Sequence, residues 1–300
     1  MSGTYGNGWT RRRVLAAGVG GAAALIAGGL ELVDHGVLPG KHMLDAVDGA
    51  CSVASPAEMF RRPGPTFTGH FHSRKRGREV GFTIAYPPGH SRGSRLPLGL
   101  YLHADGGNHA SALGGVPPAR ALAGMGLPAF ALVAADGGNL YWHPHPGDDP
   151  MGMMLDEVIP MCQRLGLGTG PNRIGAIGIS MGGYGAIAFA EKFPQTIRAC
   201  AAISPAIWTS YAQARAANAG AYTNAREFAD YDAITHTGPL AHMPVRVACG
   251  SEDPFHPGVV ALIDRLPNAV TEVTGGCHDG AFFASQRHAS LLFLGQHLTA

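Results

Sequence analysis

The sequence predicts an α/β fold in which helices flank a mostly parallel central sheet. Three short runs, at 96–102, 129–135 and 174–179, are apolar throughout, which is typical of strands buried on both faces of a parallel sheet. A helix-like run at 184–192 follows the third of them. The chain has 300 residues, 46% of them hydrophobic, which is enough for one large α/β domain and short for two.

The same patterns predict the other elements in order along the chain. Two strand-like runs joined by a basic turn open the domain and are expected to form an antiparallel hairpin. These two runs are 66–73 and 79–86; later strands are expected at 198–204, 245–249 and 270–274, and helices at 151–165 and 285–298.

Composition excludes some classes of partner and cofactor. The net charge is +1, which leaves no basic surplus for nucleic acid, so no nucleic-acid partner is expected. The cysteines have no Cys-x-x-Cys spacing typical of a metal or redox site. One disulfide is compatible with export but is not required. The five cysteines are Cys51, Cys162, Cys200, Cys249 and Cys277.

The first 33 residues are expected to direct export. The run Thr-Arg-Arg-Arg-Val-Leu at 10–15 precedes a small apolar run at 16–30 and resembles a twin-arginine signal. The stretch 14–33 is interrupted only by Glu31 and is near the length that spans a bilayer. It therefore predicts either a membrane anchor or a removed signal, with the domain outside the cytoplasmic membrane. Residues 34–65 are rich in Pro and Gly and are interpreted as a linker, and residues 66–300 form the expected catalytic domain.

A Gly-x-Ser-x-Gly motif, Gly178-x-Ser180-x-Gly182, joins the apolar strand to the helix-like run. A nucleophile on so sharp a turn is strained, and glycine two residues before and after avoids collisions with strand and helix. The helix would direct free N–H groups toward Ser180, which favours the negative charge that develops during attack on a carbonyl. The motif predicts Ser180 as a nucleophile and the Met181 amide as an oxyanion donor.

The loop after the strand at 96–102 reads His103-Ala-Asp-Gly-Gly. In hydrolases with this kind of serine turn, that loop supplies the second oxyanion amide. We expect the donor to be Asp105, with Gly106 as the next choice. His103 is expected to brace the loop rather than to react.

An acid and a histidine follow two later strands. Asp253 lies just past 245–249 and is the expected partner of the base, with Glu252 as the substitute. His278 follows 270–274 and is the expected general base. The order Ser, Asp, His, each after a separate strand, predicts a catalytic triad.

Aromatic residues are expected to line the substrate pocket. Tyr141 and Trp142 follow a strand end, where ligands of such sheets bind. Tyr184 and Trp208 complete the predicted pocket. Trp208 belongs to residues 205–243, which are interpreted as a small cap over the strand ends.

No metal and no cofactor is expected. Two histidine pairs could bind a cation, but the first has no third ligand nearby and the second lies in a Pro-rich loop, so plain structural histidines are the favoured interpretation. These pairs are His70 with His72, which share a strand face, and His143 with His145, beside Asp148 and Asp149.

Together these motifs resemble the α/β-hydrolase superfamily, and within it the esterase D type that includes S-formylglutathione hydrolases and the mycolyl-transferring antigen 85 proteins. The resemblance covers roughly 66–298 and implies ester hydrolysis or acyl transfer without a cofactor. The loop has Ala104 where Gly is commoner, and Gly182-Gly183-Tyr184 resembles the esterases more than the mycolyl transferases. The resemblance is carried by residues 178–185, 103–107, 136–142 and 156–160 and by the Asp253 and His278 turns.

The expected function is therefore that of a serine carboxylic-ester hydrolase that forms an acyl-Ser180 intermediate on a small-molecule or lipid ester. Transfer of the acyl group to a sugar or lipid hydroxyl is one alternative. A non-catalytic envelope binding protein on the same fold is another. The sequence does not predict the oligomeric state.

Overall fold

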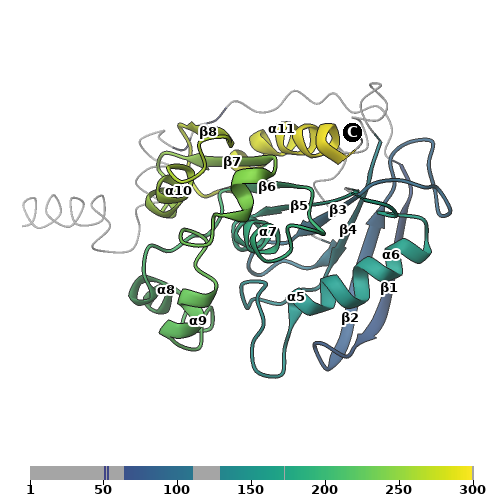
Figure 1. Cartoon of the computed structure of the whole chain (residues 1–300), viewed down its shortest axis with the longest axis horizontal. Helices are drawn as coiled ribbons and strands as arrows, with labels where there is room; N and C mark the ends of the chain where they lie inside the picture. The colour runs from purple at the N-terminus through teal and green to yellow at the C-terminus, as the bar shows by residue number, and fades with distance from the viewer. Residues whose placement is uncertain (1–50, 52, 54–63, 111–128, 172, 299–300) are drawn as a thin grey trace, which may run out of the picture. The chain divides into compact units, whose positions relative to one another are not determined.

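The computed structural model describes residues 51, 53, 64–110, 129–171 and 173–298. All but Cys51 belong to one compact unit, Ser52–Ala300. Its centre is an eight-stranded sheet in the order β1-β2-β4-β3-β5-β6-β7-β8 (Figure 1). The strands are β1 Thr66–Ser73, β2 Arg78–Ala85, β3 Leu98–Leu102, β4 Ala131–Ala135, β5 Ile174–Ile179, β6 Ala199–Ile203, β7 Val245–Gly250 and β8 Val270–Thr274.

The strand pairing confirms the predicted α/β fold. β1 pairs antiparallel with β2, as the hairpin pattern predicted, and β2 pairs antiparallel with β4. All the other pairings are parallel. The carboxyl ends of β3 to β8 therefore lie along one edge of the sheet, where the loops after these strands meet.

Helices cover both faces of the sheet (Figure 1). Alternate strand residues pack against α11 on one face and against the other helices on the opposite face. The predicted helix at 151–165 is continuous but contains a π-helical turn. The helix α10, at His256–Ile263, was not predicted from the sequence. The helices are α5 Pro150–Met153, η1 Met154–Val158, α6 Ile159–Arg164, α7 Met181–Lys192, α8 Tyr211–Ala217, α9 Ala225–Asp230, η2 Pro239–His242, α10 His256–Ile263 and α11 Gly280–Leu298.

The predicted export segment at 1–33 lies outside the described residues, as does most of the predicted linker at 34–65. Among the helices that the structure describes, none combines the length and the apolar character needed to cross a bilayer. Residues 205–243, the predicted cap, contain the short helices α8 and α9 and the 3₁₀ turn η2.

Helix α7 buries one carboxyl group, that of Glu191, which is 6% exposed. Its Oε1 has no hydrogen-bond partner among the described residues. Burial raises the pKa of Glu191 well above its usual value; Lys192 acts in the opposite direction, and Asp232 raises the pKa further. The folded state therefore binds this proton more tightly than the unfolded chain, and its relative stability falls as the pH rises through the raised pKa.

We expect Glu191→Gln, which imitates the protonated carboxyl, to raise the free energy of unfolding at pH 8 by about 1–2 kcal/mol. The difference from wild type should vanish toward pH 4, where the carboxyl is protonated in both states. Urea unfolding at the two pH values measures this directly. An equal difference at both pH values, or a variant less stable at pH 8, would show that the buried charge is not the cause.

Candidate active site

Ser180 lies at the sharp turn between β5 and α7. Its backbone has φ 55° and ψ −120°, a strained conformation for a residue other than glycine. A Cβ on Gly178 would collide with the Gly182 carbonyl, and one on Gly182 would collide with the Leu102 carbonyl. The two glycines of the motif are therefore required by the close approach of strand, turn and helix, and the turn exposes the Ser180 hydroxyl beyond the sheet edge.

Three side chains from three separate loops form one hydrogen-bonded chain at this edge. His278 Nε2 lies 2.8 Å from Ser180 Oγ, and His278 Nδ1 lies 2.8 Å from Asp253 Oδ2. The Asp253 carboxylate is buried, and its Oδ1 also accepts the Phe255 N–H at 2.8 Å. A carboxylate can only accept, so Nδ1 carries the hydrogen and Nε2 is free to accept the Ser180 proton.

Two phenylalanines that no sequence motif singled out pack on the His278 ring. Phe255 and Phe283 each lie 5.0 Å from it between ring centroids. These contacts restrict the imidazole to the plane that joins Asp253 and Ser180. Their only sequence signal is proximity, because Phe255 follows Asp253 by two residues and Phe283 follows His278 by five.

The turn offers backbone N–H groups near Ser180. Met181 is the first residue of α7, so its amide has no acceptor within the helix. In the facing loop, Gly106 N–H donates to Asn139 Oδ1 at 3.0 Å. Because the Gly106 amide already has an acceptor, Gly106 is not supported as the second oxyanion donor. The Asp105 amide stays the predicted donor.

His103 braces the loop after β3, as expected. Its Nδ1–H donates to the Ala104 carbonyl at 2.8 Å, and its Nε2 accepts the Gly137 N–H at 2.9 Å. Burial lowers the pKa of His103, which keeps the ring neutral. Trp142 donates to the His103 carbonyl at 3.1 Å and is fully buried. The prediction that Trp142 lines the pocket is therefore wrong, because its indole packs in the core behind the loop.

An open cleft of about 400 Å³ lies over Ser180 and His278. Tyr141 and Trp208 line it, as the sequence predicted. Tyr184 does not, because it is buried beneath the cleft and its hydroxyl donates to the Tyr231 carbonyl at 2.8 Å. The remaining walls come from Ala104, Asp105, Met181, Ala217, Asn218, Phe255 and Phe283.

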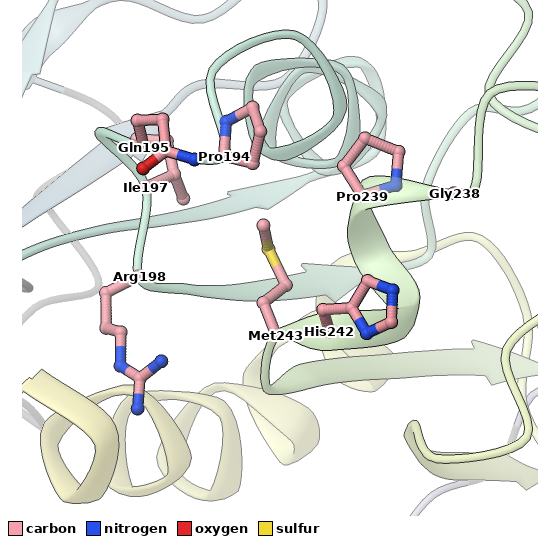
Figure 2. A pocket seen from close by; sticks show the side chains of 8 residues that line it. All are labelled: Pro194, Gln195, Ile197, Arg198, Gly238, Pro239, His242 and Met243. Atoms are coloured by element: carbon pink, nitrogen blue, oxygen red, sulfur yellow. The ribbon is translucent and has the colours of Figure 1, made fainter.

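A second hollow, of about 480 Å³, lies at the opposite edge of the sheet (Figure 2). Ile197 and Arg198 directly precede β6, and Met243 lies just before β7. Ligands of such sheets bind beyond the carboxyl ends of the strands. This hollow is at the amino ends and includes none of the three hydrogen-bonded side chains, so the cleft over Ser180 is the candidate active site.

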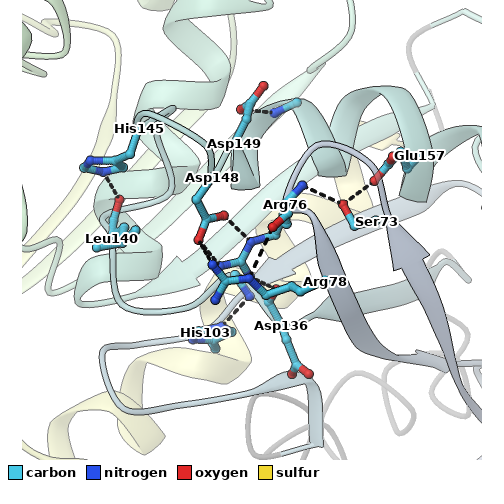
Figure 3. Close-up of polar contacts among 12 residues, drawn as sticks. Ser73, Arg76, Arg78, His103, Asp136, Leu140, His145, Asp148, Asp149 and Glu157 are labelled. Carbon is cyan, nitrogen blue, oxygen red and sulfur yellow. Dashed lines mark hydrogen bonds and ion pairs between the residues drawn. The ribbon is translucent and has the colours of Figure 1, made fainter.

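The structure does not support a cation site built on Asp148 and Asp149. Asp148 forms ion pairs with Arg76 and Arg78, and Asp149 accepts the Gly152 N–H at the start of α5 (Figure 3). His72, of the other histidine pair, instead lies 3.2 Å from the Glu79 carboxylate on an exposed face.

Comparisons with known proteins agree with this architecture. The family model described as "Putative esterase" matches residues 156–260. No curated protein sequence matches the chain. Among solved structures, a ferulic acid esterase matches with a TM-score of 0.69 and 16% identity, over 79% of this chain and 100% of that one.

Two further solved structures are similar. The fluorophosphonate-binding serine hydrolase F of Staphylococcus aureus matches with a TM-score of 0.64 and 16% identity, over 78% of this chain and 99% of that one. An S-formylglutathione hydrolase from Agrobacterium tumefaciens matches with a TM-score of 0.62 and 18% identity, over 82% and 99%. The chain thus has the α/β-hydrolase fold. With the match of the family model over residues 156–260, the chain is similar to esterases of the esterase D type.

Proposed function

We propose that this protein is an exported serine esterase that works through an acyl-Ser180 intermediate. The observation that carries the proposal is the hydrogen-bonded chain from Ser180 through His278 to Asp253, with both contacts at 2.8 Å. A nucleophile, a base in contact with it and a buried acid that orients the base are the parts that acyl transfer to serine needs.

In the first half-reaction, Ser180 Oγ attacks the ester carbonyl while His278 Nε2 takes its proton. The amides of Met181 and Asp105 hold the oxyanion, and the Asp253 carboxylate stabilises the imidazolium. His278 then gives the proton to the leaving alcohol as the ester C–O bond breaks. The products are the free alcohol and acyl-Ser180.

In the second half-reaction, His278 removes a proton from water, which attacks the acyl carbon. The acid leaves as the proton returns to Ser180 Oγ, which restores the free enzyme. A sugar or lipid hydroxyl in place of water would give acyl transfer through the same steps. The acceptor, not the triad, therefore distinguishes the hydrolase from the transferase.

The cleft favours short or aromatic acyl groups. Its volume of about 400 Å³ is near the lower end for small-molecule sites, and its apolar walls include the rings of Tyr141, Trp208, Phe255 and Phe283. One similar structure is described as a ferulic acid esterase in complex with ferulic acid, which is an aromatic acid. We propose esters of this size, rather than long-chain lipid esters, as substrates.

Hydrolysis of p-nitrophenyl esters from acetyl to palmitoyl by the full chain tests this proposal. We expect activity to be highest for short chains and to be absent from Ser180→Ala. Activity that rises toward palmitoyl would contradict the proposed acyl preference. If the folded wild type were as inactive as Ser180→Ala on every ester, the favoured function would become acyl transfer to a specific acceptor, or a binding role.

We also propose that the domain acts outside the cytoplasmic membrane. The twin-arginine-like run at 10–15 supports this, as does the disulfide-bonded state of Cys277, because disulfides persist in oxidising compartments. Replacement of both Arg11 and Arg12 by Lys is expected to keep the protein in the cytoplasm, with Arg13→Lys as the matched control. Cell fractionation with immunoblotting measures the distribution, and export of the double variant at the wild-type level would contradict a twin-arginine route.

A further inference from the structure

Three potential metal ligands meet beneath the cap, away from the hydrogen-bonded chain at Ser180. His143 and His145 come from the loop after β4, and Glu227 comes from α9. Their side chains are 0%, 8% and 14% exposed. His143 Nδ1 lies 3.4 Å and His145 Nδ1 lies 3.2 Å from the same oxygen, Glu227 Oε1. One ligand atom from each residue lies within 4.8 Å of the others.

The outer hydrogen bonds fix the hydrogen on each imidazole. His143 Nε2 lies 2.9 Å from the Ala221 carbonyl, and His145 Nε2 lies 2.9 Å from the Leu140 carbonyl (the latter contact is drawn in Figure 3). A carbonyl can only accept, so each Nε2 carries the hydrogen. In the neutral rings each Nδ1 then has a lone pair, and both lone pairs face the carboxylate of Glu227.

With Glu227, three atoms that can donate electron pairs face one another, and no cationic side chain of the described residues is paired with Glu227 Oε1. Its Oε2 accepts the Thr223 N–H at 2.9 Å, but its buried Oε1 has no hydrogen-bond donor among the described residues. The Pro144 carbonyl, 3.4 Å from His143 Nδ1, is a further acceptor. Unpartnered buried polar atoms are costly, and a bound cation would satisfy all three at once.

The environment of His143 favours a metal ion over a second proton. His143 is fully buried, and burial disfavours the charged imidazolium. The rings of Tyr222 and Tyr231 also stack on His143, at 4.9 and 4.7 Å between centroids. These surroundings favour the neutral imidazole, the form in which histidine binds metals.

We propose that His143, His145 and Glu227 bind a divalent transition-metal ion of the zinc type, with water as a fourth ligand. Bonds of about 2.0–2.2 Å at tetrahedral angles put neighbouring ligand atoms about 3.3–3.5 Å apart. The two histidine-to-glutamate separations, 3.2 and 3.4 Å, are close to this. Imidazole ligands favour zinc over calcium or magnesium, which prefer oxygen.

The ion would act as a structural clamp and would take no part in the chemistry at Ser180. It ties α9 of the cap to the loop that carries Tyr141. That tyrosine lines the active-site cleft, as do Trp208 and Asn218 of the cap. The metal therefore holds two walls of the cleft together, a role that does not depend on which ester is cleaved or on whether Ser180 is the nucleophile.

The test uses the full chain after treatment with a chelator, titrated with Zn²⁺ by isothermal calorimetry and followed by thermal melting. We expect one Zn²⁺ per chain and a rise of a few degrees in Tm at saturating metal. Glu227→Gln preserves the shape of the side chain and should weaken Zn²⁺ binding by about 100-fold or more, with no Tm response at the same concentration. His145→Asn should behave in the same way.

His236→Asn is the matched control, because His236 belongs to the same cap but hydrogen-bonds only to the Ala229 carbonyl among the contacts that the structure describes. It should bind Zn²⁺ as the wild type does. With Co²⁺ in place of Zn²⁺, the wild type should show the visible absorption of a tetrahedral site, and Glu227→Gln should not. Circular dichroism verifies that each variant is folded. The proposal would be overturned if the wild type bound no stoichiometric Zn²⁺, or if folded Glu227→Gln bound Zn²⁺ as tightly as the wild type. A simple His145–Glu227 ion pair would then explain the contact.

Discussion

Replacement of Ser180 by Ala is expected to lower kcat by about 10⁶-fold on any ester that the wild type hydrolyses. The change removes the atom that forms the proposed acyl intermediate, and among the described residues no other hydroxyl shares the 2.8 Å contact with His278 Nε2. Substrate binding should persist, because the aromatic walls of the cleft are untouched. We therefore expect a large loss of kcat with little change in the dissociation constant of a substrate analogue.

A neighbouring substitution separates this effect from general damage to the site. Ser251 is exposed in the turn after β7, and Ser251→Ala should retain wild-type kcat. Thermal unfolding should show that Ser180→Ala is folded and within about 1 kcal/mol of the wild-type stability, because the change opens no large cavity and removes only one hydrogen bond. A Ser180→Ala protein that keeps more than a tenth of wild-type kcat would exclude Ser180 as the nucleophile.

The second largest effect is expected from Asp253→Asn, which should lower kcat by about 10⁴-fold. The amide can donate a hydrogen where the carboxylate accepts one, so it favours the His278 tautomer with its hydrogen on Nε2. That tautomer cannot accept the Ser180 proton. The amide also cannot stabilise the imidazolium by charge.

Glu252→Gln is the control that the sequence itself suggests, because Glu252 was the alternative acid. Its carboxylate accepts from the Ser251 hydroxyl at 3.3 Å, whereas Asp253 Oδ2 contacts His278 Nδ1 at 2.8 Å. We expect Glu252→Gln to keep kcat within about threefold of the wild type. If Glu252→Gln were the more damaging change, the acid would be assigned to the wrong residue.

Local patterns in the sequence predicted the sheet and the turn at Ser180. The strands that are apolar throughout were found because burial on both faces leaves no polar positions. Gly178 and Gly182 could be interpreted because the collisions they avoid involve backbone only a few residues away or in the neighbouring strand. Asp253 and His278 could be located because each follows its strand directly.

Features that depend on distant contacts could not be predicted in this way. Trp142 and Tyr184 follow the rule for pocket aromatics, but Trp142 has φ 59° and its indole turns into the core against Gly185. The Gly106 amide is occupied by Asn139, 33 residues away in the chain. Glu227 is even farther from the histidines that it faces, so no ligand spacing in the sequence reveals it.

In the proposed mechanism, an acyl group becomes covalently attached to Ser180. The most direct test treats the full chain with a fluorophosphonate probe and locates the adduct by peptide mass spectrometry, with Ser180→Ala alongside. We predict one modified residue, Ser180, because its hydroxyl is the one in contact with His278 Nε2, and no labelling of the variant. A folded protein that remains unlabelled at Ser180, or that is labelled equally at another serine, would contradict the proposed role of Ser180.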